Sequence, residues 1–308
     1  MFEYTFLGTA ASAPSIQRGL ASNLVMYQDM RFLIDCGEGT QRQILRSGLG
    51  FRRLDKVLLT HGHLDHILGL GGLMSTLTRW DSVEQIEIWA GEGALERVEA
   101  LLFGVVLRDD RLPFKIVMRK IQTGILFEDE RFALRAFPVT HRGRGCFGFS
   151  FTERAHRPFL AEKATELGVP EGPERRDLVQ GNPLRLPDGR LITPEDVLGA
   201  PRNGAKLVHI GDTGRISDLI EPCFGADSLV IEATYLEEDR DLAAQFGHLT
   251  ARQAATLAQQ ANVRTLYLTH LSRRYREKDM LAEAQSVFPN THLARDFDHF
   301  QTKSPESS

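Results

Sequence analysis

The stretch Thr60-His61-Gly62-His63-Leu64-Asp65-His66 constrains what this chain can be more than any other feature. It places three imidazoles and a carboxylate within six positions, between two apolar runs at residues 56–59 and 67–70. Removing so many polar groups from water is costly unless each of them gains a partner. Neutral imidazole and carboxylate are ligands of zinc and similar ions, so the pattern predicts a metal site. The plainer alternative is a solvated polar turn.

Three other apolar runs end in the same manner, at a side chain that can bind a metal. Residues 137–141 end at His141, residues 207–212 at Asp212 and residues 266–270 at His270. Short runs of this kind are typical of buried strands, and α/β sheets carry ligand sites outside their strand ends. Seven nitrogen and oxygen ligands without a cysteine fit two zinc, manganese or iron ions better than one closed structural site. The residues expected to converge are His61, His63, Asp65, His66, His141, Asp212 and His270.

The composition is that of an ordinary soluble globular protein, with 42% hydrophobic and 25% charged residues in 308 positions. Cys36, Cys146 and Cys223 form no Cys-x-x-Cys pair, which suits a reducing cytoplasm rather than a disulfide framework. We expect no signal peptide and no membrane span, because no apolar run approaches the roughly 20 residues of a membrane helix. The net charge of −4 is no global sign of nucleic-acid binding, so RNA affinity would have to come from local basic patches.

Hydrophobic periodicity predicts two strand-rich halves, each accompanied by helices. That pattern favours two sheets packed face to face with helices outside them. Asp35 ends a predicted strand, so it is either an ordinary capping carboxylate or a partner for a metal-bound histidine. Strands are expected at residues 4–7, 23–27, 31–35, 85–90, 114–117, 132–137, 206–212 and 228–234, helices at 40–47, 66–77, 92–104, 250–261 and 277–287, and a frayed polar end at 302–308.

Residues 153–201 differ from the rest of the chain, because seven of the thirteen prolines lie there. Such a density of proline argues against a core element. A long irregular insertion in a compact domain is usually functional or disordered, and a passive surface loop is the alternative. Residues 153–203 hold eight Lys/Arg and nine Asp/Glu, so any basic character of this segment would be local.

The hexapeptide from His61 to His66 matches the HxHxDH signature of the metallo-β-lactamase superfamily. Within that superfamily the chain resembles the short-form tRNase Z family, the endoribonucleases that process tRNA 3′ ends. The resemblance runs from residue 6 to residue 291, nearly the whole chain. It is carried by Phe6-Leu7-Gly8-Thr9, Asp35-Cys36-Gly37-Glu38-Gly39-Thr40-Gln41, Gly211-Asp212-Thr213, Glu232-Ala233-Thr234, Gly247-His248-Leu249-Thr250-Ala251 and Leu268-Thr269-His270-Leu271-Ser272-Arg273-Arg274-Tyr275.

The resemblance implies an α/β fold, the metallo-β-lactamase αββα sandwich of two mixed sheets flanked by helices, with a protruding arm. Residues 1–308 would form a single domain, and residues 153–203 would be an inserted arm that grips the tRNA body. Gly168-Val169-Pro170-Glu171-Gly172-Pro173 looks like the Gly-Pro motif of that arm. The family's pattern is altered at Arg176, where glycine is common, and at Val179, where lysine is common.

The resemblance also divides the ligands between two divalent ions, with zinc as the first choice and manganese or iron as alternatives. Two ions held in this way can activate water and clamp a phosphate for in-line displacement. The two sets are His61, His63 and His141 for one ion, and Asp65, His66 and His270 for the other, with Asp212 as the bridge.

Outside the ligand set, His248 is the expected proton donor to the leaving 3′-oxygen, because histidine titrates near neutral pH. Glu232 would hold its imidazole in the donating tautomer, and Asp65 would orient the attacking hydroxide. A helix-capping or surface role is the alternative for His248. The remaining histidines, His156, His209, His292 and His299, are expected to be structural.

Basic residues beside the ligands and in the arm are candidates for contacts with RNA phosphates, although solvated surface is the usual fate of arginine. The family's PxKxRN loop, tied to sensing the CCA end of tRNA, appears here with Ile16 in place of the lysine and Gly19 in place of the asparagine. The candidate RNA-binding residues are Arg175, Arg176, Arg273 and Arg274.

We therefore predict a cytoplasmic, binuclear metal-dependent endoribonuclease that removes the 3′ trailer of precursor tRNA and leaves a 3′-hydroxyl on the tRNA. Members of the family pair as homodimers in which one subunit's arm serves the partner's active site, so a homodimer is expected. Two alternatives stay open, a hydrolase of small phosphodiesters or sulfate esters and a noncatalytic RNA-binding relative. The arm favours tRNA over the first alternative, and the intact ligand set argues against the second.

Overall fold

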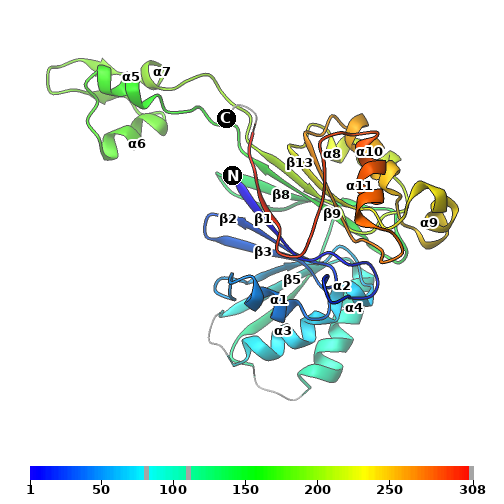
Figure 1. Cartoon of the computed structure of the whole chain (residues 1–308). Coiled ribbons are helices and arrows are strands. Elements are labelled where there is room, and N and C mark those ends of the chain that lie inside the picture. Colours follow the sequence, from blue (N-terminus) through cyan, green and yellow to red (C-terminus); the bar gives the residue numbers. More distant parts are fainter. Residues whose placement is uncertain (80–82, 109–111, 305–308) are drawn as a thin grey trace.

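Two seven-stranded mixed sheets lie face to face, with helices covering their outer faces (Figure 1). The computed structural model describes residues 1–79, 83–108 and 112–304. The first sheet has the order β16-β1-β2-β3-β4-β5-β6 and the second the order β15-β14-β13-β12-β9-β8-β7. This arrangement confirms the predicted αββα sandwich. No helix in the described ranges is long and apolar enough to cross a membrane.

Residues 2–120 build six strands of the first sheet and residues 124–293 build the second sheet, and β16 returns at residues 299–302 to the edge of the first sheet. The strands of the sheets are β1 Phe2–Gly8, β2 Ser22–Tyr27, β3 Met30–Cys36, β4 Lys56–Leu58, β5 Gln85–Ala90, β6 Lys115–Lys120, β7 Gly124–Glu128, β8 Phe132–Pro138, β9 Phe147–Glu153, β12 Lys206–His209, β13 Ser228–Glu232, β14 Thr265–Thr269, β15 Thr291–Leu293 and β16 His299–Thr302. The helices outside the inserted segment are α1 Thr40–Arg46, α2 Leu64–Ile67, α3 Gly69–Leu77, α4 Glu92–Leu101, α8 Ile220–Cys223, α9 Arg240–Phe246, α10 Ala251–Gln260 and α11 Glu277–Gln285, with short 3₁₀ or π turns at Leu102–Val106, Ser217–Leu219 and Glu237–Asp239.

Aromatic side chains fill the space between the two sheets. Phe2, Phe32, Phe132, Phe149 and Phe151 are fully buried there and come from strands of both sheets. Several of these rings meet edge to face, an arrangement that aromatic pairs prefer. Two further apolar layers lie outside the sheets, where α1, α3 and α4 cover the first sheet and α8, α10 and α11 cover the second. The packing of three layers fixes the strand ends relative to one another.

The parallel strands bring the polar residues to one edge of the sandwich. In the first sheet β3, β4, β5 and β6 are mutually parallel, and in the second sheet β12, β13, β14 and β15 are. The chain therefore leaves β4, β12 and β14 at the same edge, directly before the histidines and aspartates named above.

Some predicted elements differ from the observed ones. The helix expected at residues 66–77 is two helices, α2 and α3, that meet at Leu68, because Gly69 packs directly on the backbone of Gly37 and a Cβ there would lie 1.9 Å from its carbonyl oxygen. The helix expected at 92–104 ends at Leu101 and continues as a π turn. The prediction of a frayed end from residue 302 is wrong at its start. Thr302 is the last residue of β16, is buried, and pairs with Phe2 of β1. Residues 305–308 lie outside the described ranges.

The proline-rich segment folds into a small unit that stands away from the body (Figure 1). Its core is formed by Ala164, Val169, Leu178, Ile192 and Val197, which pack on one another. The expectation of an irregular stretch is therefore wrong: local turns, a two-stranded hairpin and short helices bury enough apolar surface to order it. Its elements are α5 Ala161–Glu166, α6 Pro173–Val179, β10 Leu184–Arg185, β11 Leu191–Ile192 and α7 Pro194–Val197.

The inserted segment leaves the body at the edge opposite the polar strand ends. It begins after Glu153, the last residue of β9, and returns at Lys206, the first residue of β12. These strands are antiparallel, and Lys206 pairs with Thr152. Backbone hydrogen bonds between His156 and Arg202, at 2.8 and 3.0 Å, close the base of the segment. We call residues 154–203 the arm.

Because the core of the arm is its own, we predict that deleting residues 159–199 leaves the body folded. The cut ends are close, since the Gly199 amide donates to the Pro158 carbonyl at 2.9 Å. The midpoint temperature of the body, measured by calorimetry, should change by less than about 4 °C, equivalent to ~1 kcal/mol.

Two matched leucine truncations test the same point without a deletion. Leu178 in the arm and Leu229 in β13 are both fully buried. Leu229→Ala should destabilise the body by roughly 2–5 kcal/mol. Leu178→Ala should leave the unfolding transition of the body unchanged. An equal loss of body stability in both variants would show that the arm and body fold as one unit.

Candidate metal centre and active site

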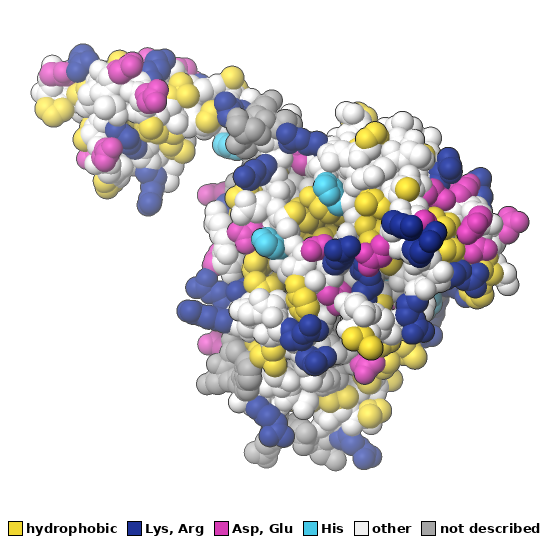
Figure 2. All heavy atoms as spheres, viewed as in Figure 1, with side chains coloured by type: hydrophobic (Ala, Val, Ile, Leu, Met, Phe, Trp, Pro, Cys, Tyr) yellow, Lys and Arg dark blue, Asp and Glu magenta, His cyan; other side chains and the backbone are white. Residues whose placement is uncertain are grey.

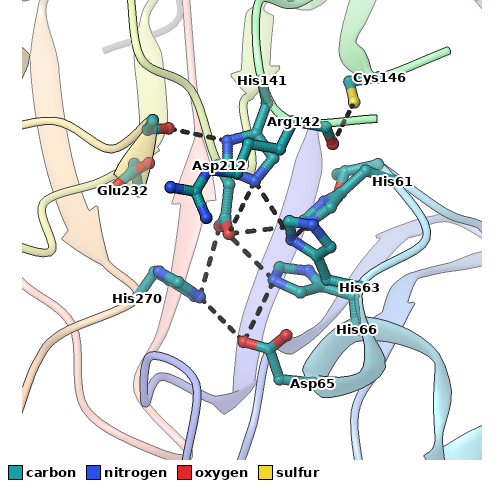
Figure 3. A network of polar contacts seen from close by, with 12 residues as sticks. His61, His63, Asp65, His66, His141, Arg142, Cys146, Asp212, Glu232 and His270 are labelled. Atoms are coloured by element: carbon teal, nitrogen blue, oxygen red, sulfur yellow. Dashed lines mark hydrogen bonds and ion pairs between the residues drawn. The ribbon is translucent and has the colours of Figure 1, made fainter. Parts of the chain in front are cut away.

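Seven side chains from both halves of the chain converge at the polar edge of the sandwich, as predicted (Figure 3). The loop after β4 supplies His61 and His63, and helix α2, which follows this loop, supplies Asp65 and His66. The loops after β8, β12 and β14 supply the other three. In Figure 3 the rings and carboxylates point toward Asp212 at the centre, from both sides. The residues are His61, His63, Asp65, His66, His141, Asp212 and His270.

Three imidazoles form a first cluster beside one oxygen of Asp212. His63 Nδ1 lies 2.9 Å from His61 Nε2 and 3.2 Å from His141 Nε2. Asp212 Oδ2 is 3.6 Å from His61 Nε2 and 3.7 Å from His141 Nε2. Ring nitrogens this close, from three different directions, face one common point.

A second cluster lies beside the other oxygen of the same carboxylate. Asp212 Oδ1 is 3.5 Å from His66 Nε2 and 3.4 Å from His270 Nε2. Asp65 Oδ2 lies 3.4 Å from His270 Nε2 and 3.8 Å from His66 Nε2. Asp212 therefore turns one oxygen to each cluster, which is the geometry of a bridging ligand.

The polar atoms of these clusters fit divalent cations. His66 Nε2 and Asp212 Oδ1 are buried, and neither has a hydrogen-bond partner in the part of the chain that the structure describes. A buried polar group without a partner is costly, and a cation between these atoms would supply one. Imidazole nitrogen and carboxylate oxygen suit zinc, manganese and iron.

The other ring nitrogens are held by partners outside the clusters. His66 Nδ1 lies 2.8 Å from Asp35 Oδ2, and His141 Nδ1 donates to the Gly247 carbonyl at 2.7 Å. His270 Nδ1 lies 3.0 Å from the Thr234 hydroxyl. Such contacts fix the ring orientation and leave Nε2 free to bind a metal. The sequence indicated Asp35, whereas the Gly247 carbonyl carries no side-chain signal and the role of Thr234 was missed.

Protonation favours the ligand form of the first cluster. Burial lowers the pKa of His61, His63 and His141, so these imidazoles are neutral and can donate a lone pair. Burial raises the pKa of Asp212, but the imidazoles of His270 and His66 outweigh it and hold that pKa well below its usual value. The first cluster thus combines neutral nitrogen donors with a charged carboxylate. In the second cluster burial lowers the pKa of His66, but Asp212 and Asp35 outweigh it and raise that pKa well above its usual value, so a cation there would displace a proton.

His248 and Glu232 form a hydrogen-bonded pair beside the clusters. His248 Nδ1 lies 2.9 Å from Glu232 Oε1. The His248 ring stacks on the ring of His270, with 5.5 Å between the ring centroids. Glu232 is 0% exposed and also accepts hydrogen bonds from the Thr213 amide and the Thr234 hydroxyl. Burial lowers the pKa of His248, but Glu232 outweighs it and raises that pKa to about 9. The imidazole therefore holds a proton that it can give away.

The four arginines predicted to meet RNA lie in different settings. Arg175 is turned inward, because its guanidinium donates to the carbonyls of Val169 and Pro170 and its side chain is only 19% exposed. Arg176 is exposed on α6. Arg273 lines a cavity of about 370 Å³ next to His270. Arg274, at the same edge, pairs with Asp239 at 3.2 Å.

Of the histidines expected to be structural, His209 is the clearest case. It is buried between the sheets, and its Nδ1 lies 2.8 Å from the Tyr4 hydroxyl. Among the described residues, His209 belongs to neither of the two clusters.

Known proteins resemble this chain over its whole length. The ribonuclease Z of Bradyrhizobium diazoefficiens is 48% identical over 97% of this chain and 99% of its own, and that of Archaeoglobus fulgidus is 38% identical over 100% of both. The crystal structure of the short form of human tRNase Z covers 97% of this chain and 99% of its own at 28% identity, with a TM-score of 0.70. Family models for the Anti-Pycsar protein Apyc1 and for a β-lactamase superfamily domain match residues 2–156 and 181–271.

The shared position of Asp212 makes it the most sensitive ligand. We predict that Asp212→Ala, which removes an oxygen from each cluster, abolishes retention of metal at both after dialysis, measured by elemental analysis. Glu232→Gln is the matched control. Glu232 is a buried carboxylate in the same network, and its side-chain partners are His248 and Thr234 and not the nitrogens of the two clusters. Metal content that is unchanged in Asp212→Ala would exclude the bridging role.

Proposed function

Because the chain belongs to the ribonuclease Z family and is an endoribonuclease of tRNA 3′ processing, we propose that it removes the 3′ trailer of precursor tRNA at the centre around Asp212. The observation that carries this assignment is the pairing of two ligand clusters with a proton-donating histidine beside them. Hydrolysis of a phosphodiester needs both an activated water and a protonated leaving oxygen.

We propose two divalent ions per subunit, with zinc as the native metal. The first cluster and Asp212 Oδ2 would hold one ion, and the second cluster and Asp212 Oδ1 the other. When bound, such a pair lowers the pKa of a shared water and neutralises charge on the phosphate. The histidine-rich ligand set supports zinc, although manganese and iron accept the same donors.

The protein groups would handle the protons of the reaction. Asp65, whose side chain is 14% exposed, would accept a hydrogen bond from the attacking hydroxide and orient it toward phosphorus. The new oxygen–phosphorus bond forms as the bond to the tRNA 3′-oxygen breaks. His248 would donate its Nε2 proton to that oxygen, while Glu232 holds the ring through Nδ1. The tRNA would leave with a 3′-hydroxyl and the trailer with a 5′-phosphate.

We propose that the arm grips the body of the tRNA and does so for the partner's active site in a homodimer. The arm springs from the edge of the sandwich opposite the metal centre, and it extends away from α2, which carries Asp65 and His66 (Figure 1). Because the arm points away from the centre of its own subunit (Figure 1), its placement supports a role at the centre of a partner. Figure 2 shows side chains of both charge signs on the visible face of the arm, so its contacts would be local. Arg176 is its exposed candidate, whereas Arg175 supports the fold of the arm.

We further place the enzyme in the cytoplasm. All three cysteines are unpaired and buried, which is the state that a reducing compartment maintains. Precursor tRNA as substrate agrees with this placement.

Replacing His248 by alanine should slow cleavage of a 3′-extended tRNA by roughly 10²–10⁴-fold, the usual contribution of general acid catalysis. A bis-nitrophenyl phosphate, whose leaving group needs no proton, should lose much less activity in the same variant. Single-turnover rates on both substrates are the measurement. Equal losses on the two substrates would rule out proton donation by His248.

Deleting residues 159–199 should raise the Michaelis constant for tRNA strongly while hydrolysis of small diesters is largely retained. Each lost phosphate contact weakens binding and flattens its salt dependence, because fewer counterions are released. Kinetics at several salt concentrations give both values. Arg176→Gln should also raise the Michaelis constant for tRNA, but by less than the deletion. Arg264→Gln, which changes an exposed arginine of the body, is the matched control. Unchanged tRNA processing by the deletion variant would make the arm a passive loop.

A further inference from the structure

The loop between β1 and β2 contacts the second cluster, although it contributes no ligand to it. The Ser12 amide donates to Asp65 Oδ2 at 3.0 Å. On the other side of the loop, the Leu271 amide donates to the Thr9 carbonyl at 2.9 Å, and the Ala11 amide donates to the Leu271 carbonyl at 3.1 Å. Residues 9–20, which we call the Ser12 loop, thus hold Asp65 directly and His270 through the residue that follows it.

Two residues in these contacts have an unfavourable backbone conformation. Ser12 has φ 56° and His270 has φ 55°, both in the left-handed region that residues other than glycine rarely adopt. Such conformations persist only where the surrounding structure imposes them. For His270 the restraints are the contact of its Nδ1 with the Thr234 hydroxyl at 3.0 Å and the loop contacts at Leu271. If the loop relaxed, His270 Nε2 would move away from Asp65 and Asp212.

One carboxylate, that of Asp296, ties both ends of the Ser12 loop to the body. Its Oδ1 accepts from the Thr9 hydroxyl at 2.7 Å, and its Oδ2 accepts from the Gly19 amide at 2.6 Å. The same Oδ2 accepts from Gln43 Nε2 at 2.7 Å, which connects the loop to α1. Arg18 adds to this anchor, because it is only 9% exposed and donates to Thr9 and to the Ala294 carbonyl.

The first cluster is supported from elsewhere. His61 Nδ1 lies 3.0 Å from the Thr60 hydroxyl, and this hydroxyl donates a hydrogen bond to Asp35. His141 is held by the Gly247 carbonyl. Weakening the Ser12 loop would therefore disturb the ligands of one cluster and leave the supports of the other in place.

From these contacts we propose that Asp296 is a positioning residue that sets the metal affinity of the second cluster, acting through the Ser12 loop on Asp65 and His270. The inference rests on the binuclear centre proposed above. Asp296 contacts neither cluster itself, so its effect is transmitted by the Ser12 amide and by the backbone of Leu271.

The test uses two backgrounds that each retain one cluster. His63→Ala should keep only the second site, and Asp65→Ala only the first. The apoproteins are titrated with Zn²⁺ against a chromophoric chelator, with and without Asp296→Asn. We expect Asp296→Asn to weaken Zn²⁺ binding in the His63→Ala background by about 10–100-fold, the usual effect of removing a support for a metal ligand. In the Asp65→Ala background it should change affinity by less than about 2-fold.

Asp298→Asn is the matched control. Asp298 is a carboxylate two positions away, but its oxygen accepts from the Arg295 amide within its own turn and not from the Ser12 loop. It should leave both affinities unchanged. Thr9→Val, which removes the hydroxyl between Asp296 and Arg18 with little change in volume, should weaken the second site selectively and to a smaller extent. If Asp296→Asn does not fold, the Thr9→Val result decides.

The outcomes separate this inference from the proposed centre. A wild-type protein that binds only one Zn²⁺ ion would refute the binuclear centre. A wild-type protein that binds two, with Asp296→Asn indistinguishable from Asp298→Asn or weakening both sites alike, would refute the positioning role of Asp296 and leave the centre intact.

Discussion

The carboxylate of Asp212 is the point on which the site depends, because each of its oxygens faces a different cluster. It follows β12 in the second sheet, whereas His61 and His66 belong to the loop after β4 in the first sheet. The distances of 3.5 and 3.6 Å between these groups therefore report how closely the two sheets are set against each other. The aromatic layer between the sheets keeps that spacing, since a packed interior yields little to local strain. Fold and chemistry are linked through this one residue.

Backbone strain marks the same region. Asp35, His270 and Ser12 all have positive φ, and all three contact the second cluster or form part of it. Asp35 accepts from the Thr60 amide and hydroxyl and lies against His66, so its strained backbone directs one carboxylate to two elements at once. Conformations of this kind are found where surrounding contacts over-determine the chain. Strained backbone conformations therefore position more of the second cluster than of the first.

Features of the fold and the site could be predicted from the sequence where they depend on the type of a side chain, and not where they depend on backbone groups. The seven candidate ligands were visible as polar residues at or just after the ends of apolar runs, because strand direction carries them to one edge. Glu232 follows a further apolar run, whereas His248 was indicated by the segment at residues 247–251 that resembles the tRNase Z family. The supports made by backbone groups, the Gly247 carbonyl and the Ser12 amide, have no sequence signature. Strands β7, β9, β15 and β16 were not predicted, and of these β15 and β16 have only three and four residues, which show no clear period. The arm was misjudged because proline density hid a small core built from separated apolar residues.

The position of the arm has a consequence for how the enzyme divides its work. The strand β9 starts beside the centre, where the Phe147 amide donates to the Thr60 carbonyl, and ends at Glu153, where the arm begins. The length of this strand therefore separates the centre from the arm within one subunit. If each arm serves the partner subunit, as proposed above, the pair would select a substrate by its length and shape before any base is read, because a tRNA reaches from an arm to a centre and a small ester does not. Specificity of this kind needs no basic surface over the whole protein, which agrees with a net charge of −4.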